Sequence, residues 1–205
     1  MSVVDRYLAG LESAYRASHL PEEWDRFIEQ TGPHAASSEE IEAIRTLYPL
    51  VPETLLELLF RFNGSNTTDL SGGGFAIGIP TLSSSDPDGT YSYYLLSARE
   101  IVENTDEATY LHEYIDRKYE GEEWVTVDPR IGNNSKETHW LHFADCTNNG
   151  GTSQLFIDFS PSPSGTVGQI VRYVHDPDEL MPIADSFEKY LCQVIDDGFV
   201  FVNEW

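Results

Sequence analysis

The chain has 205 residues, of which 35 are Asp or Glu and 12 are Lys or Arg, so its formal net charge is −23. A surface this acidic repels nucleic-acid phosphates and anionic lipid head groups, so we expect neither nucleic-acid nor membrane binding. It attracts a basic partner, although acidity can also serve solubility alone. Hydrophobic residues make up 40% of the chain, which excludes a disordered protein and favours one compact domain.

No apolar run approaches the roughly 20 residues that span a bilayer. The N-terminus, Met1 to Arg6, lacks a basic start followed by an apolar stretch, so we expect no signal peptide and a cytoplasmic location. In that compartment Cys146 and Cys192 are expected to be two reduced thiols.

The first 36 residues are predicted to form a helical extension of a main domain that covers 37–205. Tyr7, Leu11 and Tyr15 recur at helical spacing, and Pro21 is expected to begin a second helix. The Gly- and Pro-containing stretch 31–36 then separates this arm from the rest of the chain.

The main domain is predicted to begin with two more helices. Ser37 and Glu40 form a capping-box pattern that opens the first of them. Pro52 suits the first turn of the second, whose leucines follow helical spacing until Asn63-Gly64 provides a stop.

Two strands and then two helices are predicted up to residue 135. The segments 75–79 and 91–96 are expected to be strands, with a turn at Asp86–Gly89 between them. Ser97 and Glu100 repeat the capping-box pattern, and a further helix is expected around Tyr110–Ile115.

Three strands are predicted at 139–144, 154–159 and 169–174, and short polar turns between them indicate antiparallel pairing. Asp185 and Glu188 are expected to cap a last helix, and 199–202 to add an extended tail. The order predicts an α+β fold with one twisted antiparallel sheet and helices mainly on one face.

The sequence gives little support for a metal or cofactor site. His139 and His142 lie three residues apart on a predicted strand, so they point to opposite faces and cannot share an ion. Asp86-Pro87-Asp88-Gly89 begins like a calcium loop, but Tyr91 occupies the position where that loop needs glycine. We therefore expect no cofactor and a simple turn.

Catalytic motifs are equally weak, so no enzyme is predicted. The chain has no G-x-S-x-G, and no Gly-Lys-Ser/Thr follows Gly72–Gly74. Cys146 with His142, and Asp145 with Asp158, form candidate pairs only if the fold brings them together. An uncharacterised hydrolase is the least favoured interpretation.

Protein binding is the function that composition favours, because Tyr and Trp beside acidic loops suit an interface. Core packing is the simpler explanation for many of these aromatic residues. The residues predicted to bind a partner, chosen for loop position and charge, are Asp86, Asp88, Tyr91, Asp145, Asp176, Asp178 and Glu179.

Several segments, read in order, resemble the SMI1/KNR4 family, also called the SUKH superfamily. The helix Val51–Gly64 is similar to the family's "LP…(Y/F)…NG" helix. A second set of blocks is similar to the family order "W-x-P-F-A-D…G-G…DL-x-P…G-x-x-G-Q-V…H-D…SF-x-x-(F/Y)-L". These blocks are 140–145, 150–151, 156–159, 165–170, 175–176 and 186–191.

The resemblance covers roughly 37–195 and departs from the pattern at His142, which replaces the usual proline. It implies an α+β fold without known enzymatic activity. Many bacterial members resemble immunity proteins that neutralise toxins, often nucleases, and fungal members resemble signalling scaffolds. We therefore expect a protein that neutralises a toxin such as a basic nuclease, with a scaffold or regulatory protein as the alternative.

Overall fold

The computed structural model describes residues 1–31, 35–68, 76–86, 89–105, 107–147, 153–175 and 178–203. The α-helices are α1 (Val3–Ala17), α2 (Pro21–Thr31), α3 (Ser38–Leu47), α4 (Glu53–Arg61), α5 (Ala98–Glu103), α6 (Glu107–Tyr119) and α7 (Phe187–Asp196). The strands are β1 (Asn66–Thr68), β2 (Ala76–Gly78), β3 (Leu82–Asp86), β4 (Gly89–Leu95), β5 (Thr126–Val127), β6 (Trp140–Cys146), β7 (Gln154–Asp158), β8 (Gln169–Val174) and β9 (Glu179–Ala184). Two 3-10 turns, η1 (Ser135–Glu137) and η2 (Val200–Asn203), complete the set.

The predicted α+β fold is confirmed. Seven strands form a curled sheet in the order β3-β4-β6-β7-β8-β9-β5, and β1 pairs with β2 separately. The pairs from β3 to β9 are antiparallel, whereas β5 runs parallel to β9, so the sheet is mixed. The predicted meander 139–174 corresponds to β6, β7 and β8.

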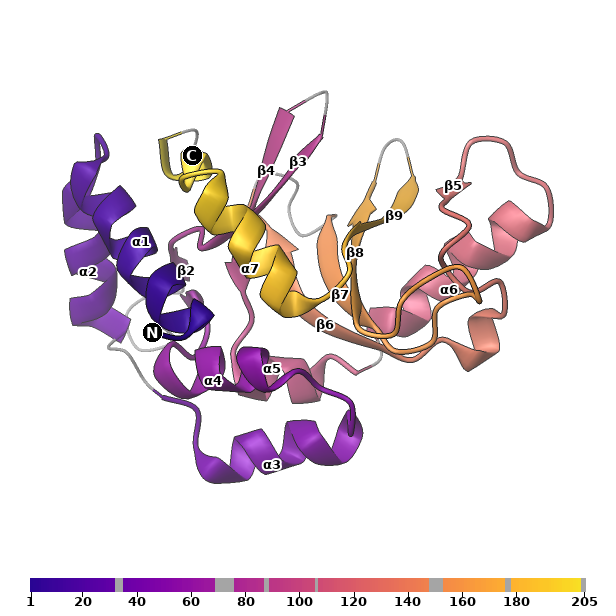
Figure 1. Cartoon of the computed structure of the whole chain (residues 1–205), viewed down its shortest axis with the longest axis horizontal. Helices are drawn as coiled ribbons and strands as arrows, with labels where there is room; N and C mark the ends of the chain where they lie inside the picture. Colours follow the sequence, from indigo (N-terminus) through magenta and orange to yellow (C-terminus); the bar gives the residue numbers. More distant parts are fainter. Residues whose placement is uncertain are drawn as a thin grey trace.

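The two faces of the large sheet pack on different helices (Figure 1). Helix α7 lies across one face, where Phe143 of β6 contacts Phe187 and Tyr190 edge-on. Helix α6 covers part of the other face, where Leu111 and Ile115 join a smaller buried cluster with strand residues. Helices therefore lie on both faces, with most of them on the α7 side.

The capping boxes predicted at Ser37–Glu40 and Ser97–Glu100 are both present, and Ser2–Asp5 forms a third at α1. Each serine hydroxyl accepts from the third backbone N–H, which satisfies a donor that the first helical turn leaves open. The sequence predicts Pro52 in the first turn of α4, but the structure makes it the N-cap, one residue before the helix begins.

The C-terminal predictions need two corrections. Ser186, rather than Asp185 with Glu188, caps α7, because its hydroxyl accepts from Lys189 N–H at 3.2 Å. The segment predicted as an extended tail instead forms η2, after Phe199 adopts a positive φ of 57°. The turn lets Phe201 bury its ring in the main core.

The N-terminal arm is bound firmly to the rest of the protein. Tyr7 and Tyr15 are buried, and their hydroxyls donate to the carbonyls of Thr81 and Pro80 beside edge strand β3. Tyr190 of α7 donates to Ser83 O at 2.8 Å. These hydroxyls satisfy carbonyl groups along an edge that would otherwise invite another strand.

Candidate functional site

Three pairs of neighbouring strand ends lie at one end of the large sheet, which we call the turn end (Figure 1). They are the ends of β3, β6 and β8 with the starts of β4, β7 and β9. Because the neighbours from β3 to β9 are antiparallel, alternate connections must lie at the same end of the sheet. Loops on a rigid sheet are where binding residues commonly gather.

All seven residues predicted to bind a partner belong to these three hairpins. Asp86 and Tyr91 belong to β3 and β4, Asp145 to β6, and Glu179 to the start of β9. Asp178 immediately precedes β9. Asp88 and Asp176 lie outside the described residues, as does the side chain of Asp86.

Asp145 is held by a buried histidine. Its Oδ1 lies 3.0 Å from Nε2 of His142, which also lies 3.1 Å from Ala144 O. Since both neighbours accept hydrogen bonds, Nε2 carries a proton, and Nδ1 has no partner among the described residues. The Asp145 side chain is 31% exposed, so it is fixed in place and still reaches solvent.

Asp178 has a different role, because it is buried. Its Oδ1 lies 2.7 Å from His175 Nδ1 and accepts from the Tyr173 hydroxyl at 3.2 Å. Burial is the main cause that raises the pKa of Tyr173, and the nearby carboxylate adds to it. Asp178 therefore fixes the β8–β9 connection and presents little carboxylate surface of its own.

Glu179 is paired with an arginine inside the curl of the sheet. Arg172 Nη2 donates to Glu179 Oε1 at 2.8 Å, and the Arg172 side chain is only 3% exposed whereas that of Glu179 is 27% exposed. The guanidinium carbon lies 5.4 Å from the centre of the Tyr91 ring, within cation–π range. Tyr91 and Glu179 thus flank one buried charge.

A hollow adjoins the turn end, between β3, β9 and the last turn of α7. Its volume is about 340 Å³, and its polar lining includes Ser83, Ser84, Ser85, Gln193, Asp196 and Asp197. The last turn of α7 has no basic residue, although a carboxylate there opposes the helix dipole. Asp196 and Asp197 are not among the seven residues predicted to bind a partner, although two carboxylates in the last turn of a helix are a signal present in the sequence.

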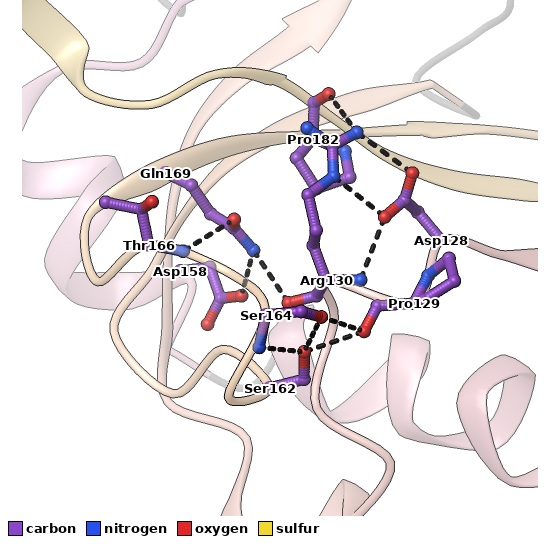
Figure 2. Close-up of polar contacts among 9 residues, drawn as sticks. All are labelled: Asp128, Pro129, Arg130, Asp158, Ser162, Ser164, Thr166, Gln169 and Pro182. Carbon is purple, nitrogen blue, oxygen red and sulfur yellow. Dashed lines mark hydrogen bonds and ion pairs between the residues drawn. The ribbon is translucent and has the colours of Figure 1, made fainter.

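The opposite end of the sheet is locked by buried polar contacts (Figure 2). Gln169 Nε2 donates to Asp158 Oδ2 at 2.9 Å and to Arg130 O at 3.2 Å, and its Oε1 accepts from Thr166 N–H at 3.1 Å. Burial raises the pKa of Asp158, which is fully enclosed. These contacts join the β7–β8 loop to the segment before β6.

A second set of contacts secures the same end (Figure 2). The Arg130 guanidinium donates twice to Asp128 at 2.9 Å and holds the pKa of that carboxyl below its usual range. Ser162 Oγ donates to Pro129 O at 2.6 Å. Because these polar groups bind one another, we assign this end of the sheet a structural role.

The candidate catalytic pairs are separated by the fold. Asp145 pairs with Gln154 in the ladder and Asp158 with Trp140, so the two carboxylates lie at opposite ends of β6–β7. Cys146 packs in the larger core on the α7 side, whereas the His142 ring stacks on Phe156, which belongs to the smaller core.

The predicted separation of the two histidines is confirmed. The His139 ring contacts Tyr48 and Phe159 of the larger core, away from His142. Within the residues that the structure describes, no three His, Cys, Asp or Glu side chains are grouped to hold a metal.

The Gln169 loop and the first turns of α7 contain two of the sequence blocks that resemble the family pattern, 165–170 and 186–191. The SMI1 / KNR4 family (SUKH-1) model matches residues 35–193. The chain belongs to this family. No curated protein gave a match.

The SMI1/KNR4 match begins after α2, so α1 and α2 lie outside it although they share the main core. Gln169 and Asp158, whose hydrogen bond helps to lock the opposite end of the sheet, lie inside the matched range. None of the described helices combines the length and apolar character needed to cross a bilayer.

Proposed function

We propose that this SMI1/KNR4 protein is an immunity-type binding protein that neutralises a toxin through the acidic turn end. The observation that carries the proposal is that Asp145 and Glu179, at the turn end of β6 and β9, are each held by a buried partner and still reach solvent. Asp196 and Asp197 add two carboxylates in the hollow beside β3. The family includes immunity-type proteins, which supports the same role.

The net charge of −23 supports a basic partner. Complementary charge accelerates encounter and excludes partners of like charge. A nuclease must attract anionic phosphates, so its active site is basic. An acidic protein that covers such a site competes with nucleic acid for the same positive groups.

The side chains at the turn end suit binding because several are already fixed. His142 holds Asp145, and buried Arg172 holds Glu179. Ordering a free side chain on binding costs about 0.5–1.5 kcal/mol, and a carboxylate held in advance avoids much of that cost. Tyr91 adds an aromatic surface beside these charges.

The test is binding to, and protection from, the product of a neighbouring toxin-like gene. We expect Asp196→Lys with Asp197→Lys to weaken binding and to abolish much of its salt dependence. The matched control is Glu39→Lys with Glu42→Lys, because both residues are exposed on α3, away from the turn end.

Equal loss of binding in the two charge-reversed variants would show that only overall charge matters and would refute this site. Binding to several proteins with no protection from a toxin would instead favour the scaffold or regulatory role. Neutralisation by occlusion would be supported if one equivalent of this protein inhibits the activity of the toxin and if added salt weakens that inhibition.

A further inference from the structure

Two hollows follow one face of α6, far in sequence from the turn-end hairpins. The first, of about 200 Å³, is lined by residues that include His112, and the second, of about 360 Å³, by residues that include Asp116, Tyr119 and Glu120. These four positions have the spacing of a single helix face. The segment 133–139 supplies the opposite wall of both hollows, so together they form a groove, which we call the α6 groove.

One end of the α6 groove is aromatic and apolar. The rings of Tyr48 and His139 stack with centroids 5.3 Å apart, and Trp140 also lines this hollow. Leu47 lines it as well and leaves 40% of its surface exposed. Rigid aromatic walls around a small hollow suit a single bulky apolar side chain, since such pockets hold the anchors of protein interfaces.

A buried polar atom in this end still lacks a partner. His112 Nε2 is shielded from solvent and has no hydrogen bond within the described residues, and His112 lines the hollow. Burial lowers the pKa of His112, so the ring is neutral near pH 7. A buried nitrogen without a partner costs free energy, which a ligand can recover. A peptide backbone suits it, because it offers both a donor and an acceptor to either tautomer.

The other end of the α6 groove is acidic. Asp116 and Glu120 are exposed, and neither makes an ion pair among the described residues. Asn133 and Asn134 add amide groups, and Lys136 is the one cation in this lining. Two carboxylates against one ammonium leave a site that favours a basic side chain.

The distance between the two ends sets the spacing of a ligand. Glu120 follows the last residue of α6 and still donates to Asp116 O at 2.8 Å, so the eight residues from His112 to Glu120 rise about 12 Å along the axis. An extended chain rises about 3.3 Å per residue, so the same distance spans about four residues. We propose that the α6 groove binds an extended segment of a partner protein that carries a bulky apolar side chain and, about four residues away, Lys or Arg.

This surface is separate from the turn end, so the inference does not depend on the proposed neutralisation of a toxin. The probes are two fluorescein-labelled five-residue peptides, Leu-Ser-Gly-Ser-Arg and its reverse, because the groove alone does not fix the chain direction. Fluorescence anisotropy measures their binding to the full chain. We expect saturable binding of at least one, and weaker binding when its Leu is replaced by Ala or its Arg by Glu.

The decisive variant is Asp116→Asn with Glu120→Gln, which keeps shape and removes two exposed charges. Since each exposed ion pair contributes about 0.2–1 kcal/mol, we expect about twofold to thirtyfold weaker binding of the peptide. Asp196→Asn with Asp197→Asn removes the same charge at the turn end and should leave peptide binding unchanged. Circular dichroism checks that every variant is folded.

His112→Phe tests the apolar end separately. It should weaken the binding of both the Arg-containing peptide and its Glu analogue. The inference is overturned if neither peptide binds saturably up to about 1 mM. It is also overturned if the α6-groove variant and the turn-end variant lose the same peptide affinity. A toxin that binds the α6-groove variants normally and fails with the turn-end variants leaves the proposed function intact. The two proposals can therefore fail independently.

Discussion

Replacing Gln169 should lower the free energy of unfolding substantially. Its side-chain amide joins three groups from three segments, namely Asp158, Arg130 O and Thr166 N–H (Figure 2). Gln169→Leu keeps a similar volume and removes all three hydrogen bonds. Asp158 would then remain buried with one fewer donor, while a backbone carbonyl and a backbone N–H lose their partners.

The expected cost follows from the type of each bond. A hydrogen bond to a charged group contributes about 1.5–3 kcal/mol and a neutral one about 1 kcal/mol, so the three together contribute about 3–5 kcal/mol. With a urea dependence of about 2 kcal/mol per molar, the unfolding midpoint should fall by about 1.5–2.5 M. Urea titration followed by tryptophan fluorescence measures this shift.

The pH dependence gives an independent test of the same cause. Burial raises the pKa of folded Asp158, so this group favours the folded state when protonated, and that contribution is lost as pH rises through the folded pKa. The Gln169 hydrogen bond lowers this pKa. Its removal should therefore cost most above the folded pKa of Asp158, and the difference from wild type should shrink as pH falls through it.

Gln154→Leu is the matched control. Gln154 is also a buried glutamine, placed on β7 next to β8, but its amide makes one long contact of 3.3 Å to the half-exposed Asp145. We expect its loss to cost less than about 1 kcal/mol. If the two substitutions cost the same, or if the Gln169→Leu cost does not change with pH, the charged hydrogen bond to Asp158 is not the cause.

Three other results are expected. Tyr190→Phe removes the buried bond to Ser83 O and should lower the free energy of unfolding by about 1–2 kcal/mol, whereas Tyr119→Phe on the surface should change it little; chemical denaturation compares them. Gly165→Ala places a Cβ 2.3 Å from Arg130 O and should lower stability by more than about 2 kcal/mol, seen as a lower melting temperature. Under native conditions Cys192 should react with a thiol reagent while buried Cys146 resists until unfolding, which mass spectrometry of labelled peptides reports.

The parts of the fold predicted from the sequence are those with strong local signals. Serine caps, helical leucine spacing and runs such as Gln169–Val174 depend on neighbours in sequence, and the structure confirms them. Strand β3 was missed because Leu82–Asp86 contains three serines and has low strand propensity. The Ser83 carbonyl accepts from Tyr190 of α7, and the Thr81 carbonyl just before the strand accepts from Tyr7 of α1, a tertiary effect that no local pattern contains.

Strands β5 and β9 were missed for related reasons. Strand β5 has two residues and exists through its parallel pairing with β9, and Pro182 within β9 argues against a strand. Here the proline lies at a register shift between Ile170 and Val171 of the partner β8, where a missing N–H is tolerated. The sequence located the acidic hairpins, but it could not show that Asp178 is buried while Asp145 stays accessible.

The contact between His142 and Asp145 leads to a prediction about binding rather than stability. Because His142 fixes a carboxylate that is 31% exposed, His142→Leu should release Asp145 while leaving that carboxylate in place. Ordering one side chain costs about 0.5–1.5 kcal/mol, so a partner bound at the turn end should bind about twofold to tenfold more weakly. Calorimetric titration of the partner into the wild type, each single variant and the double variant with Asp145→Ala forms a double-mutant cycle. If His142 acts through Asp145, its effect should disappear in the Asp145→Ala background; an undiminished effect there would mean that His142 shapes the turn end by packing on Phe156 instead.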